Sequence, residues 1–103
     1  MKTRRETLEE FVALDQNDSF SRYALALEFE KEGGIDDAAL QLREVISRDP
    51  AYVAAYHQLG RLLSQTGFVE EARETYRRGV EAALVSGDQR ARSEMQEALE
   101  MLE

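Results

Sequence analysis

The sequence lacks cysteine altogether and contains a single histidine among its 103 residues. Without thiols it cannot form a disulfide, a thiolate nucleophile or a thiolate metal site. One histidine, His57, excludes a histidine cluster, and no Glu-x-x-His spacing surrounds it to complete a metal site. Acidic pairs such as Glu70-Glu71 lie where a helix is predicted to start. There their negative charges interact favourably with the positive end of the helix dipole, which is a structural role. We therefore expect no metal, no cofactor and no enzymatic activity.

Basic residues and long apolar runs are also scarce. The chain has 13 Lys and Arg residues and 21 Asp and Glu residues, which gives a net charge of −8. Phosphate repels such a chain, so we expect no nucleic-acid partner. No apolar run approaches the roughly 18–20 residues needed to span a bilayer, and Glu6 precedes any stretch resembling a signal peptide. These features predict a cytoplasmic protein with no membrane partner.

Proline and glycine are few, and they fall between segments that have a helical period. The chain has one proline and six glycines, and apolar and polar residues never alternate for long. Helix-forming residues dominate, so the sequence predicts an all-α fold with six helices. The expected helices run over residues 3–14, from about 19 to 32, from 36 to 48, from 50 to 66, from 69 to about 84, and over 88–102.

Three helix starts carry sequence signatures. Thr3-x-x-Glu6 and Ser86-x-x-Gln89 match the capping box, in which the first side chain caps the helix and the fourth reaches back. Asp49-Pro50 predicts that the fourth helix begins with an aspartate cap and a proline in its first turn.

The chain repeats itself at an offset of 34 residues. The coinciding pairs include Leu25 with Leu59, Gly33 with Gly67, Arg43 with Arg77 and, further upstream, Leu8 with Leu42. The pattern predicts a single domain over 1–103. Within it we expect a half repeat at 3–14, full repeats at 19–50 and 51–84, and a C-terminal capping helix at 86–102.

The second hairpin reads Tyr56-x-x-Leu59-Gly60-x-x-Leu63, then Gly67, then Ala72-x-x-x-Tyr76. This pattern resembles the tetratricopeptide repeat, a 34-residue helix-turn-helix unit. The resemblance implies an α-solenoid of antiparallel helix hairpins. The sequence departs from the pattern at Arg22, where the family prefers a large aromatic residue, and at Gly79, which is usually alanine. The closing proline is missing at Leu84, which fits an array that ends there.

The resemblance also implies where partners bind. First-helix residues of such repeats line a concave groove that takes up extended peptides or partner helices. Mapped onto this sequence, the groove holds an apolar patch and a cationic end, with the residues Phe20, Tyr23, Leu27, His57, Gln58, Arg61, Gln65 and Arg92. The alternative for Phe20 and Tyr23 is that they pack beneath the N-terminal helix as core. Tyr23 and Leu27 occupy the positions of the family's carboxylate clamp, so recognition of chaperone tails by that route is disfavoured.

The leading functional hypothesis is a protein-interaction module with an adaptor or scaffold role. Its partner is expected to be a protein or peptide. The alternatives are a self-associating module and an accessory subunit of a larger complex. Self-association as a homodimer is an alternative because solenoids usually need about three repeats for stability, and two and a half are recognised here.

Overall fold

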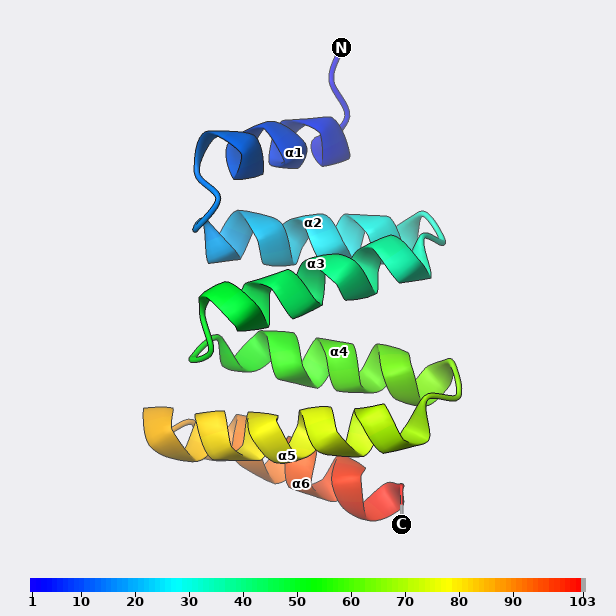
Figure 1. The fold of residues 1–103 in the computed structure, drawn as a ribbon, viewed down its shortest axis with the longest axis vertical. Coiled ribbons are helices and arrows are strands. Elements are labelled where there is room, and N and C mark those ends of the chain that lie inside the picture. The colour runs from blue at the N-terminus through cyan, green and yellow to red at the C-terminus, as the bar shows by residue number, and fades with distance from the viewer. Residues whose placement is uncertain (103) are drawn as a thin grey trace. The chain divides into compact units, whose positions relative to one another are not determined.

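The computed structural model describes residues 1–102, and the regular structure in that range is entirely helical. The chain divides into two compact units, one over Met1–Asp49 and one that begins at Pro50. The first contains α1 (Arg4–Leu14), α2 (Ser19–Lys31) and α3 (Ile35–Arg48), and the second contains α4 (Val53–Gln65), α5 (Val69–Ser86) and α6 (Gln89–Met101) (Figure 1). The predicted all-α fold of six paired helices is confirmed.

In the first unit, α2 packs between α1 and α3. The contact with α1 is made by Leu8, Val12, Ala24 and Leu25, which are all buried. Thr3 begins α1 as predicted: its Oγ1 accepts the N–H of Glu6 at 3.1 Å, and the Glu6 carboxylate accepts the N–H of Thr3 at 3.1 Å. The capping box is therefore confirmed.

In the second unit, a glycine lets α4 and α5 approach closely. A Cβ atom at Gly60 would lie 2.5–2.8 Å from ring atoms of Tyr76, far inside van der Waals contact. Tyr76 is 4% exposed, so its ring occupies the space that a side chain at position 60 would need. The Gly60 of the repeat pattern is thus required by packing rather than by a turn.

The start of α4 differs from the prediction. Asp49 is the C-cap of α3, with its N–H bonded to the Val45 carbonyl, and α4 begins only at Val53. A residue before proline is disfavoured in helical geometry, and Asp49 adopts φ −140° and ψ 77°. Its carboxylate instead accepts a hydrogen bond from the Ser19 hydroxyl at 3.1 Å, which ties the end of α3 to the start of α2.

The predicted capping box at Ser86 is also wrong. Ser86 still belongs to α5, and its hydroxyl donates to the Ala83 carbonyl. Gly87 adopts a left-handed conformation with φ 76°, which ends α5 at little steric cost. Asp88 then caps α6 by accepting the N–H of Ala91 at 3.0 Å, so the cap lies two residues later than expected.

Arg22 fills the buried position where the repeat pattern prefers an aromatic residue, and only 6% of it is exposed. Its Nη1 donates to Gln41 Oε1 at 3.1 Å, and its Nη2 donates to the carbonyl and Oε1 of Gln16, both at 3.0 Å. Burial lowers the pKa of Arg22, and the nearby charge of Arg48 lowers it further. The guanidinium therefore links the α1–α2 turn to α3 through neutral acceptors.

Asp18 caps α2 and gives the first unit a testable pH dependence. Its carboxylate accepts the Ser21 hydroxyl at 2.6 Å and the Ser21 N–H at 3.0 Å. These two hydrogen bonds lower the pKa of Asp18 from its ordinary value of 3.8. The cap is therefore fully stabilising above pH 3.8, and its contribution is lost as the pH falls through the lower pKa of the folded state.

We expect Asp18→Ala to lower the free energy of unfolding by about 1 kcal/mol at pH 7. The difference from the parent protein should shrink below pH 3.8, where the parent loses the same charge. Urea unfolding followed by circular dichroism at pH 7 and pH 3 measures both values. Asp36→Ala is the control, since Asp36 lies in the first turn of α3 without capping it. An equal effect of both variants at pH 7 would contradict the cap assignment.

Candidate functional site

The predicted apolar patch lies on α2 and is partly open to solvent. Phe20 is 70% exposed and Leu27 is 37% exposed, while Tyr23 is half-buried. The core between α1 and α2 is built from other residues, so packing of Phe20 beneath α1 is wrong. The three side chains follow one another at intervals of three and four residues, which places them on one face of the helix.

The predicted polar residues on α4 are joined by hydrogen bonds. Arg61 Nε donates to Gln58 Oε1 at 3.3 Å, and its Nη1 donates to Gln65 Oε1 at 3.0 Å. Spacings of three and four residues bring these side chains together along one helix face. The guanidinium is thereby held in place between two amide groups.

His57 lies in a more acidic setting than the sequence predicts. It contacts Tyr76 edge to face, with ring centroids 6.3 Å apart. Burial raises the pKa of the Tyr76 hydroxyl, which keeps this neighbour neutral. A pocket of about 330 Å³ beside His57 is also lined by Glu94 and Glu97 from α6. Arg92 is exposed on α6 and does not line this pocket, so the charged side chains that line it with His57 are acidic.

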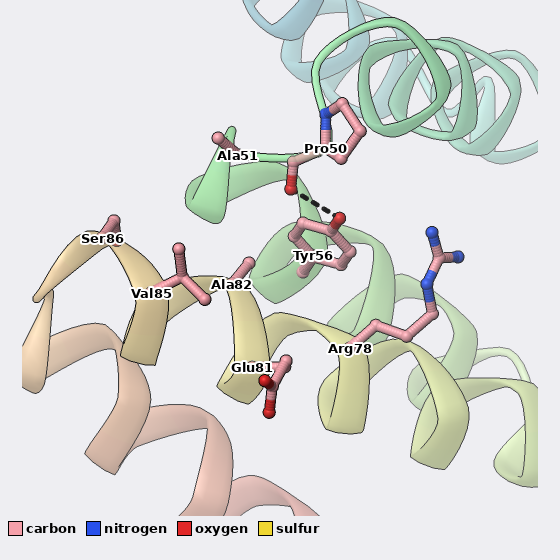
Figure 2. Close-up of a pocket in the computed structure, with 8 residues that line it drawn as sticks. All are labelled: Pro50, Ala51, Tyr56, Arg78, Glu81, Ala82, Val85 and Ser86. Carbon is pink, nitrogen blue, oxygen red and sulfur yellow. Dashed lines mark hydrogen bonds between the residues drawn. The ribbon is translucent and has the colours of Figure 1, made fainter.

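A second pocket in this unit was missed by sequence reasoning. It has a volume of about 420 Å³ and lies between the start of α4 and the C-terminal half of α5 (Figure 2). Its lining residues are Pro50, Ala51, Tyr56, Arg78, Glu81, Ala82, Val85 and Ser86. The available signal was weak: Ala82 and Val85 are apolar residues outside the buried stripe of α5, a common feature of helix surfaces.

Tyr56 forms the wall of this pocket. Its hydroxyl donates to the Pro50 carbonyl at 2.7 Å, shown as a dashed line in Figure 2. The guanidinium carbon of Arg78 lies 5.6 Å from the centre of its ring, within the range of a cation–π contact. The hydrogen bond and the cation–π contact hold the aromatic ring in a fixed orientation.

Two further properties of residues 1–102 bear on function. None of the helices there combines the length and apolar character needed to cross a bilayer. The same residues contain no group of three or more histidine, aspartate or glutamate side chains placed to hold a metal ion.

A family model described as tetratricopeptide repeat matches residues 31–90. The chain belongs to the tetratricopeptide repeat family. A tetratricopeptide repeat-containing protein of Pseudomonas aeruginosa is 29% identical over 90 residues, which cover 87% of this chain and 86% of that protein. The solution structure of a tetratricopeptide repeat domain protein from Salinibacter ruber is 37% identical, with a TM-score of 0.82 over 86% of this chain and 90% of that one.

The fold also resembles that of a more distant solved structure. The type III secretion translocator chaperone SycD of Yersinia enterocolitica superposes with a TM-score of 0.86 over 95% of this chain and 68% of that one. At 17% identity the likeness shows the fold alone. Tetratricopeptide repeat domains generally act as protein–protein interaction modules and are typically non-catalytic.

Proposed function

We propose that this tetratricopeptide repeat protein is an adaptor or scaffold that binds a peptide or partner helix through the residues assigned to its groove. The observation that carries the proposal is the exposure of Phe20 and Leu27 beside Tyr23 on α2. Apolar side chains gathered on one solvent-facing helix face are typical of a docking surface.

The proposed groove residues of the second unit lie on α4 and are polar. Because Gln58 and Gln65 already hold the Arg61 guanidinium, a partner that contacts it orders fewer rotamers on binding. The first unit thus offers apolar anchors on α2, and the second offers an ordered arginine on α4; aromatic and arginine contacts usually dominate binding energy.

The first test uses a partner captured with the full chain and identified by mass spectrometry. We expect Tyr23→Ala and Arg61→Ala each to weaken its binding about threefold to tenfold in calorimetric titration. Leu40→Ala and Arg77→Ala are matched controls, because both side chains are exposed on the second helices of their hairpins. Unchanged affinity in both test variants would rule out the groove assignment.

A further inference from the structure

The pocket beside Tyr56 has the composition of a binding site. Apart from three polar residues, its lining is apolar, and its volume of about 420 Å³ lies in the range of small-ligand and side-chain sites. Figure 2 shows Ala82 and Val85 pointing from α5 toward Ala51 and Tyr56. Val85 is 81% exposed, so the described part of the second unit leaves this apolar side chain open to solvent.

Arg78 gives the pocket a positive charge at one end. Apart from its contact with the Tyr56 ring, Arg78 makes no hydrogen bond or ion pair with the residues from 1 to 102. A cation–π contact uses none of the guanidinium N–H donors, so these donors stay available. Glu81 also lines the pocket, but its carboxylate points away from Tyr56 in Figure 2, whereas the Arg78 guanidinium contacts the ring.

We propose that this pocket binds a segment of a partner protein that combines an apolar side chain with an acidic one. The apolar side chain packs against Ala82 and Val85 on α5, and the acidic side chain accepts hydrogen bonds from Arg78. Tyr56 closes the pocket from within: it is only 3% exposed, and its hydroxyl is already bonded to Pro50, so this wall presents no unpaired donor.

The net charge of −8 does not prevent such binding. At physiological ionic strength the Debye length is about 8 Å, so a carboxylate in contact with Arg78 experiences mainly that local charge. Tyr56 and the neighbouring His57 project about 100° apart around α4, which separates this pocket from the proposed groove residues. The two proposals are therefore independent, and either can fail alone.

The test titrates the full chain with three capped tetrapeptides and follows the ¹H–¹⁵N and methyl NMR spectra. Acetyl-Ala-Leu-Glu-Ala-amide carries both recognised groups, the Gln analogue lacks the charge, and the Ala-Ala-Glu-Ala analogue lacks the apolar anchor. We expect millimolar binding of the first peptide, with shifts centred on Ala51, Ala82 and Val85. Each analogue should bind about threefold or more weakly.

Exposed neighbours on α5 provide matched controls. We expect Arg78→Gln and Val85→Ser to weaken binding of the first peptide about threefold to fivefold. Arg77→Gln and Leu84→Ser change the same residue types outside the pocket and should leave affinity unchanged. All four side chains are exposed, so the variants should keep the fold.

Three results would overturn the proposal. The first is absence of pocket shifts up to 10 mM peptide, a concentration well above the roughly millimolar affinity expected of one side-chain contact. The second is equal binding of the Glu and Gln peptides. The third is a change in the same signals on dilution without peptide, which would identify a second copy of the chain as the occupant.

Discussion

Replacement of Met95 by alanine is expected to lower the free energy of unfolding by about 2–5 kcal/mol. Met95 is 0% exposed and is the only residue of α6 that is buried among those described. Its removal creates a cavity where α6 packs on α5, and it also removes the main apolar anchor of the terminal helix. The protein should remain helical at low temperature but melt well below the parent.

Chemical denaturation followed by circular dichroism measures this loss. Met101→Ala is the matched control, since Met101 lies in the same helix and is 83% exposed. Both variants make the same residue change, and at the exposed end of α6 it removes little packing, so the difference between them reports mainly the packing contribution. A loss below about 1 kcal/mol for Met95→Ala would show that the interior tolerates the cavity.

Gly79→Ala is expected to destabilise the protein by up to about 2 kcal/mol, although alanine is the better helix former. A Cβ atom at this position would lie 2.7 Å from Tyr56 Cβ and in hard contact with the Sδ atom of Met95. Overpacking of this kind costs roughly 1–3 kcal/mol, and the gain in helix propensity offsets about 1 kcal/mol of it.

A double-mutant cycle identifies the cause. Without the methionine side chain, the new methyl group at position 79 enters the cavity left by Met95→Ala. We expect the cost of Gly79→Ala to fall by about 1 kcal/mol in that background, measured by the same denaturation experiment. Strict additivity would show that Gly79 and Met95 are not coupled and that the clash with Tyr56 decides the cost.

The helices could be predicted because their signals are local. The capping box at Thr3 was correct, since both partners lie within one turn and need nothing else. The caps predicted at Asp49 and Ser86 failed because each residue was also suited to end the preceding helix. In both cases the backbone geometry beside Pro50 or Gly87 decided between the two roles.

The candidate site was less predictable, because exposure and charge pairing depend on neighbours from other helices. Helical spacing placed Phe20 and Leu27 on one helix face but did not determine whether that face is buried or exposed to solvent. His57 was assigned to a cationic end, whereas Glu94 and Glu97 of α6 line the same pocket. The pocket beside Tyr56 combines residues about 30 positions apart in the sequence, so no local spacing of residues predicts it.

The sequence by itself determined the number and period of the helices, the 34-residue repeat and membership of the tetratricopeptide repeat family, because these rest on contacts within a turn or between adjacent helices. The tertiary structure alone decided what the departures from the repeat mean. Arg22 is buried because Gln16 and Gln41 accept its hydrogen bonds, and Gly79 is small because Met95 fills the space beside it. Such residues depend on side chains brought together only by packing, so their roles cannot be read from a local pattern.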